Sequence, residues 1–267
     1  MDKIVFPMKV LAVKLEFRRQ LLERMPKGFC KIINGIQYVI ITTDPDNPKY
    51  NARHSRKIMT SSKLGKKYSE KINDYLNLKS EYDSLLNIWK STYSFSPPRV
   101  VFPIIQPYDP HCMNNDYFNK QLDKQGKYIP DNPTISEHGV LKSKNEQIGA
   151  DILKRLGIPF KYETEIYLPA IGDTINPDYL VNFYEIDRCA YLELLGMNDR
   201  IDYSVRSATK ITGFSKDKYR PGREVIYVHV YDKYNFDESY FTSQVLSAFN
   251  DLIPDSALIW ESQSEAC

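Results

Sequence analysis

Two carboxylates fall at positions in the second half of the chain where they could do chemistry together. Asp178 follows Pro177 at the start of the predicted strand PDYLVNF, and Glu193 lies 15 residues later inside the apolar run YLELLG. A carboxylate in an apolar strand is costly to bury unless it is paired or bound to a metal. If the two strands pair as a hairpin, both side chains can converge on one edge of a sheet. Hard oxygen ligands at such a point favour Mg²⁺ or Mn²⁺ over zinc, as a metal-dependent phosphodiesterase requires.

A third acid, Glu146, lies on a helix predicted just before these strands, and it can reach the same point if that helix packs beside them. Each acid also has a purely structural interpretation. Asp178 could cap the start of a strand, Glu193 could pair with a buried arginine such as Arg206, and Glu146 could be an ordinary solvated helix residue. The residues alone leave both interpretations open.

The elements that must position these acids are predicted from the spacing of apolar residues. In chain order they are a helix over 141–157, strands over 160–168, 177–183 and 188–196, a polar helix over 199–218, a strand over 223–230 and an amphipathic helix over 241–253. This order predicts a mixed sheet flanked by helices, in the α+β (α/β) class.

These segments resemble the PD-(D/E)XK nuclease superfamily, which has the restriction-endonuclease-like fold. The matching segments are SKNEQIGADILKRLGIPFKYE, NPDYLV and YLELLGM. A group of uncharacterised bacterial proteins with the pattern RSKSE, PYRYE, PDF and YWEHFGM is similar over roughly residues 136–232, and also in the front-half segment MPKGFCKIINGIQYV. The resemblance implies a nuclease whose products end in 5′-phosphate. It implies Asp178 and Glu193 as metal ligands, Glu146 as an outer ligand or holder of a metal-bound water, and Glu163 as a supporting residue.

The superfamily pattern places a lysine two residues after the second acid, where this chain has Leu195. Glu193 and Leu195 face the same side, because side chains alternate along a strand. One hypothesis is that the lysine has migrated: some relatives with the YWEHFGM pattern carry it on the following helix, where this chain has Lys210. Lys210 would then orient or activate the attacking water. The other hypothesis is that catalysis is lost, nucleic-acid binding is kept, and Lys210 is a surface residue.

A basic stretch in the front half is the second candidate site. Residues 1–94 carry a net charge of +9 and residues 95–267 a net charge of −7, which suggests a polyanionic partner for the front half. We expect a helix over 9–25, a hairpin turning at Asn34–Gly35, a basic loop, and an amphipathic helix over 69–93. The loop either contacts nucleic-acid phosphates, with Tyr50 and Tyr68 available for stacking, or is merely solvated. The expected phosphate contacts are Lys49, Arg53, Arg56, Lys57, Lys63, Lys66 and Lys67.

These patterns predict three regions: a basic N-terminal module over 1–94, a Pro-rich connector over 95–135, and a nuclease-like domain over 136–267. The leading hypothesis is a magnesium-dependent (or manganese-dependent) nuclease acting on DNA. One alternative is a catalytically inactive nucleic-acid-binding protein on the same fold. Another is a protein-interaction module that uses the 69–93 helix. A homodimer is compatible with all three.

The composition excludes several other classes of protein. The chain has 267 residues, 42% hydrophobic and 26% charged, which is typical of a globular protein. No apolar run approaches the ~18 residues that a membrane helix needs. Lys9, Lys14 and Glu16 interrupt the stretch that a signal peptide would require. The four cysteines lack a CxxC pattern, which disfavours disulfides and structural zinc. We therefore expect a cytoplasmic protein without a membrane partner.

Overall fold

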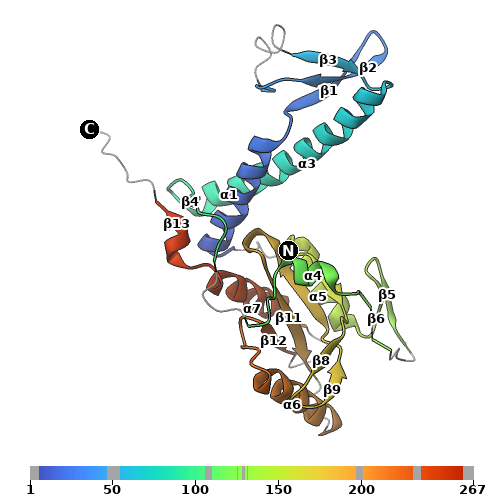
Figure 1. Ribbon diagram of the computed structural model, residues 1–267, viewed down its shortest axis with the longest axis vertical. Helices are drawn as coiled ribbons and strands as arrows, with labels where there is room; N and C mark the ends of the chain where they lie inside the picture. Colours follow the sequence, from blue (N-terminus) through green and yellow to red (C-terminus); the bar gives the residue numbers. More distant parts are fainter. Residues whose placement is uncertain are drawn as a thin grey trace. The chain divides into compact units, whose positions relative to one another are not determined.

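The computed structural model divides into two compact units (Figure 1). It describes residues 6–46, 55–105, 110–124, 126–127, 130, 132–196, 201–230 and 236–260. Unit 1 comprises Met1–Val10 and Val101–Leu258, and unit 2 comprises Leu11–Val100 and Ile259–Cys267. This division differs from the predicted regions 1–94, 95–135 and 136–267, because much of the predicted connector belongs to unit 1. Met113 and Phe118 of that connector are buried in the core of unit 1, where their apolar side chains leave water.

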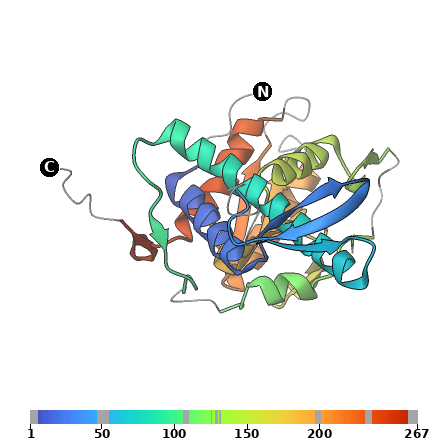
Figure 2. The same cartoon turned by 90° about the horizontal axis from the view of Figure 1, so that it is seen from above.

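Unit 2 is a helix, a three-stranded antiparallel sheet and a long helix. Its main elements are α1 (Met8–Arg24, which begins in unit 1), β1 (Gly28–Ile33), β2 (Ile36–Ile41), β3 (Arg56–Met59), α3 (Lys63–Thr92) and β4 (Arg99–Val100). The hairpin between β1 and β2 turns at Asn34 and Gly35, which both have positive φ as a type I′ turn requires. The sheet order is β1-β2-β3, and α3 packs against all three strands (Figure 2).

The long helix α3 begins earlier than the sequence suggested. Ser62 caps it by accepting a hydrogen bond from the Gly65 backbone N–H at 3.0 Å, which satisfies one of the open donors of the first turn. Gly65 is also needed for packing, since a Cβ there would lie 1.8 Å from the Met59 carbonyl oxygen. Part of the predicted basic loop is therefore helical and forms the first two turns of α3.

Unit 1 is built around a mixed four-stranded sheet of order β12-β11-β10-β7. Its strands are β7 (Phe160–Tyr162), β10 (Tyr179–Phe183), β11 (Arg188–Leu195) and β12 (Val225–His229), and its main helices are α4 (Asn115–Lys120), α5 (Lys144–Arg155), α6 (Ile201–Lys216) and α7 (Glu238–Asp251). Smaller strands are β5 (Thr134–Ser136), β6 (Gly139–Leu141), β8 (Ile166–Leu168), β9 (Asp173–Ile175) and β13 (Leu258–Ile259). β7, β10 and β11 pair antiparallel, whereas β11 and β12 are parallel and are joined through α6.

Side chains alternate between the two faces of this sheet along each strand, and different helices pack on the two faces. Tyr179 points to the face covered by α5, where its hydroxyl approaches Gly149. Leu180 and Tyr191 point to the other face and share a core with Phe214 of α6. The single strand predicted over 160–168 is broken into β7 and β8, and β8 pairs with β9 instead of continuing in the main sheet.

The predicted α+β class is confirmed by this mixture of helices and sheets. Within the part of the chain that the structure describes, no helix combines the length and the apolar character needed to cross a membrane.

Candidate active site

Asp178 lies between Glu163 and Glu193 on neighbouring strands, and these three residues are called the acid row. β10 and β11 are in a register that pairs Tyr179 with Leu192, so one residue earlier Asp178 stands opposite Glu193. On the other side, Tyr179 pairs with Tyr162, and the Glu163 backbone N–H donates to the Asp178 carbonyl oxygen at 3.1 Å. Directly opposed residues of an antiparallel pair point to the same face. The hairpin thus brings Asp178 and Glu193 together, as the sequence predicted.

Lys210 reaches this row from α6. Its Nζ lies 2.7 Å from Glu193 Oε1 and 3.0 Å from Oε2, and it also donates to the Asn176 carbonyl oxygen at 3.4 Å. The position follows from helix geometry, because Phe214 is one turn further along α6 and packs with its ring centroid 5.7 Å from that of Tyr191. Lys210 lies one turn before Phe214 on α6, and Glu193 lies two residues after Tyr191 on the same face of β11. The contact between Phe214 and Tyr191 therefore places Lys210 beside Glu193.

This geometry gives Glu193 a different cationic partner from the arginine considered in the sequence analysis. The carboxylate is 3% exposed and pairs with Lys210, while Arg206, the structural partner considered from the sequence, is exposed. Leu195 shares the face of Glu193 and is buried there as an apolar residue. The Lys210 ammonium thus lies beside Glu193, within the distance that the migration hypothesis predicts, and the same ion pair also fits a structural role.

The electrostatics of the acid row are dominated by burial and mutual repulsion. Burial, followed by the negative charge of Asp178, raises the pKa of Glu193 to about 8, and Lys210 opposes the rise. Burial also raises the pKa of Asp178, although Lys210 and the Leu194 backbone N–H, 2.6 Å from Asp178 Oδ2, stabilise the charged form. The pKa of Lys210 is raised: burial alone would lower it, but Glu193 and Asp178 outweigh that effect. Because Asp178 and Glu193 face each other across the β10–β11 pair, the ionisation of one carboxyl disfavours the ionisation of the other.

Glu146 is held apart from this pair by its own partners. Its carboxylate accepts hydrogen bonds from the Tyr162 hydroxyl at 2.5 Å, the Lys142 backbone N–H at 2.9 Å and Ser143 Oγ at 3.0 Å. Burial, and then the charge of Asp178, raises its pKa to about 7. Glu146 therefore senses Asp178 electrostatically from the first turn of α5, so the predicted role as an outer residue fits better than direct ligation.

Two residues near the row carried no role in the sequence analysis. The Lys142 ammonium forms an ion pair with Glu163, which is buried and has a φ of 46°. A left-handed backbone is uncommon for a non-glycine residue and is found at sites where the fold imposes it. Tyr162 binds Glu146, as described above. Lys142 lies in the segment LKSKNE and Tyr162 in the segment PFKYE, which both carried the family resemblance. Their presence in these segments was the sequence signal that could have identified them as site residues.

The donor set of Asp178 and Glu193 fits a hard divalent cation. Two buried carboxyls on paired strands repel each other when both are ionised, and a dication between them would relieve that repulsion. Glu146 does not complete a tight ligand set with them. Among the described residues, Glu137, His138 and Asp151 form the one group whose ligand atoms all lie within 4.8 Å of one another. In that group His138 Nε2 lies 2.9 Å from Asp151, and Glu137 is paired with Lys154.

The predicted basic loop is only partly described by the structure, since Lys49, Arg53 and Tyr50 lie outside the described residues. Arg56 and Lys57 lie on the edge strand β3, and both are exposed. The remaining predicted contacts, Lys63, Lys66 and Lys67, are exposed in the first two turns of α3. The described part of the basic stretch is therefore a strand and a helix N-terminus rather than a loop.

Comparisons of the chain with protein-family models, with curated proteins and with solved structures find no match.

Proposed function

We propose that this chain is a metal-dependent nuclease that hydrolyses phosphodiester bonds of DNA on a restriction-endonuclease-like domain. The observation that carries the proposal is the meeting of three side chains from three elements: Asp178 before β10, Glu193 on β11 and Lys210 on α6. A lysine beside two carboxylates on neighbouring strands is the arrangement that the PD-(D/E)XK resemblance implies. The order α5-β7-β10-β11-α6-β12 also supports the fold assignment.

Each residue has a distinct role in the proposed reaction. Asp178 and Glu193 would hold Mg²⁺ or Mn²⁺, which supplies Lewis acidity and a more acidic bound water. Lys210 orients the attacking water and offsets negative charge that develops on the phosphate in the transition state. Its ammonium is the cationic form at neutral pH, because Glu193 and Asp178 raise its pKa. Glu146, fixed by Tyr162, would act as an outer residue that holds a water of the bound metal.

The basic surface of unit 2 supplies the attraction for DNA in this proposal. The first turn of α3 has no acidic residue, although acids stabilise a helix N-terminus and lysines there cost about 0.3–1 kcal/mol each. Lys63, Lys66 and Lys67 at the positive end of the helix dipole, together with Arg56 and Lys57 on β3, form a surface suited to phosphate groups.

The test is cleavage of plasmid and single-stranded DNA by the full chain in Mg²⁺, in Mn²⁺ and in EDTA. The proposal expects cleavage with either metal, none in EDTA, and loss of cleavage in Glu193→Gln, which retains the shape of the side chain. Lys216→Ala, which removes an exposed lysine from the same helix, is the matched control and should cleave as the unaltered chain does.

A chain that binds DNA but cleaves none under any metal condition would overturn the enzyme proposal. The inactive binding protein, which Leu195 in the usual lysine position favours, would then take its place. Two results would refute the proposed DNA surface: unchanged DNA binding in Arg56→Glu, or a loss of binding in Lys90→Glu, at the other end of α3, as large as that in Arg56→Glu.

A further inference from the structure

The three-stranded sheet of unit 2 turns one face to α3 and has a mixed aromatic and basic surface on the other. Side chains alternate along a strand, so the residues of each strand divide between the two faces. Gly28 marks the α3 face, because a Cβ there would lie 2.9 Å from Ile72 Cδ1 of α3. The register of β1, β2 and β3 then assigns the other residues. The face opposite α3, called the outer face, carries Phe29, Lys31, Ile33, Ile36, Tyr38, Ile40, Lys57 and Met59.

Two rows of directly opposed residues cross the outer face from β1 to β3. Their members are Lys31, Tyr38 and Met59 in one row, and Phe29, Ile40 and Lys57 in the next. Each row therefore has a lysine at one edge of the sheet and apolar or aromatic side chains beside it. The two lysines lie at opposite edges. With ~4.8 Å between strands and ~3.3 Å per residue, their backbone positions are roughly 12 Å apart.

The apolar side chains of the outer face are partly exposed to solvent. Met59 is 48% exposed and Ile36 is 46% exposed, whereas Ile40 at the centre of the face is 4% exposed. Phe29 and Tyr38 are half-buried, so each ring keeps part of its surface accessible. Apolar surface that stays exposed on one face of a sheet is typical of an interaction site.

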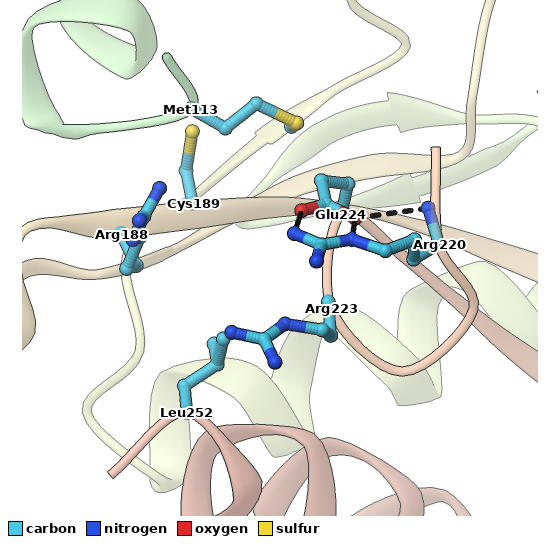
Figure 3. A pocket seen from close by; sticks show the side chains of 7 residues that line it. All are labelled: Met113, Arg188, Cys189, Arg220, Arg223, Glu224 and Leu252. Atoms are coloured by element: carbon cyan, nitrogen blue, oxygen red, sulfur yellow. Dashed lines mark hydrogen bonds and ion pairs between the residues drawn. The ribbon is translucent and has the colours of Figure 1, made fainter. Parts of the chain in front are cut away.

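The charge of the outer face indicates the kind of partner. β1, β2 and β3 contain no acidic residue. Within the part of the chain that the structure describes, neither Lys31 nor Lys57 forms an ion pair, and both are exposed. The arginines of unit 1 provide a contrast, since Figure 3 shows Arg220 paired with Glu224 at a pocket of only about 10 Å³. Lysines without acidic partners beside accessible rings fit a ligand that has both negative charge and flat apolar surfaces.

We propose that the outer face binds single-stranded DNA, with bases against Tyr38 and Phe29 and phosphates at Lys31 and Lys57. A single strand exposes the faces of its bases, which stack on aromatic side chains whatever the sequence, whereas a duplex keeps them inside. At about 3.4 Å per nucleotide along a stacked strand, the distance between the two lysines spans roughly three nucleotides. The inference rests on the proposed function for the choice of DNA, and it deepens that proposal by naming a single strand as the ligand of unit 2.

The test measures binding of the full chain to a short fluorescein-labelled single strand, and to its duplex, by anisotropy in EDTA. EDTA prevents metal-dependent cleavage, so the result does not depend on the proposed nuclease activity. Tyr38→Leu keeps apolar bulk but lacks the aromatic ring. It should raise the Kd for the single strand by about fivefold or more, as loss of one stacked base does, and leave the Kd for the duplex nearly unchanged. Tyr38→Phe keeps the ring and should bind as the unaltered chain does.

Matched variants control for effects outside the outer face. Tyr167→Leu removes an exposed tyrosine from β8 of unit 1 and should not change the affinity. Lys31→Gln should reduce the slope of log K against log salt for the single strand by ~0.7, as expected for one lost phosphate contact. Lys90→Gln, near the end of α3, should leave that slope unchanged. If Tyr38→Leu fails to fold by circular dichroism, photo-cross-linking of a 5-iodouracil oligonucleotide to the unaltered chain should label the peptide that contains Tyr38.

Several results would overturn the inference. They are an unchanged single-strand affinity in Tyr38→Leu, an equal loss of duplex binding in that variant, or an unchanged salt slope in Lys31→Gln. A dimer that Ile36→Glu dissociates in sedimentation, with no change in DNA affinity, would assign the outer face to a second copy of the chain instead. A chain that binds the single strand through Tyr38 but cleaves no DNA would support this inference and refute the nuclease proposal. Metal-dependent cleavage by a chain whose variants bind normally would refute this inference alone.

Discussion

Replacing Lys210 by alanine removes the cation from the acid row while leaving Asp178 and Glu193 in place. Lys210 contributes two hydrogen bonds to Glu193, at 2.7 and 3.0 Å, and a third to the Asn176 carbonyl oxygen at 3.4 Å. Loss of one group that stabilises charge in a transition state typically lowers a rate by a factor on the order of 10² to 10³. We expect Lys210→Ala to lower the single-turnover cleavage rate by at least that factor.

Two further measurements distinguish a catalytic role of Lys210 from a merely structural one. Lys210 competes with any cation for Glu193, so Lys210→Ala should bind Mn²⁺ as tightly as the unaltered chain or more tightly in calorimetry. DNA affinity in Ca²⁺, measured by fluorescence anisotropy, should change less than threefold, and Lys216→Ala should match the unaltered chain throughout. A Lys210→Ala variant that cleaves at the full rate, while Glu193→Gln does not, would refute the reasoning.

The same site predicts a pH dependence of stability for the chain in EDTA. The folded pKa of Glu193 is raised to about 8, mainly by burial, so the folded chain keeps a proton that the unfolded chain releases above its own pKa of 4.5. The stability that this proton gives is complete below that pKa and is lost as the pH rises through about 8. Glu193→Gln should flatten the decline of the unfolding free energy between about pH 5 and about pH 8 in urea titrations. Equal slopes in the two proteins would contradict the assignment of that proton to Glu193.

Three further predictions concern other features of the chain. Asp178→Asn keeps an oxygen for the Leu194 N–H but removes a charge, so Mn²⁺ binding in calorimetry should be lost while circular dichroism is unchanged; undiminished affinity would exclude Asp178 as a ligand. Charge reversal of Arg56 and Lys57 should reduce the slope of log K against log salt for duplex DNA by ~0.9 for each lost phosphate contact, and an unaltered slope would leave them merely solvated. Burial raises the pKa of the Cys189 thiol to about 12, so iodoacetamide at neutral pH should modify the exposed Cys30 and spare Cys189 until the chain unfolds. Modification of Cys189 in the folded chain, detected by mass spectrometry of its peptides, would contradict this prediction.

Local patterns in the sequence determined much of this protein. Asn34–Gly35 specified the hairpin of unit 2, because both positions need a positive φ that these residues tolerate. The period-two alternation of a strand put Glu193 and Leu195 on one face. The sequence also predicted that Asp178 and Glu193 would meet if their strands paired as a hairpin, and β10 and β11 do pair in this way. These features depend on neighbours in the chain, so they are readable from spacing alone.

Other features were set by contacts between residues far apart in the sequence. The start of α3 at Lys63 depends on its Ser62 cap and on the close packing of Gly65 against Met59, and this turned part of the expected loop into a helix. Met113 and Phe118 joined the core of unit 1 because the sheet and α6 offered an apolar surface to cover. The Pro-rich composition of their segment gave no sign of that surface.

The position of Lys210 beside β11 was decided in the same way. The sequence suggested Lys210 only through the family resemblance. The packing of Phe214 beside Tyr191 fixes the position of α6 along β11 and so places the Lys210 ammonium beside Glu193. Sequence spacing encodes which face a side chain takes within one element, whereas the meeting of side chains from different elements depends on how those elements pack.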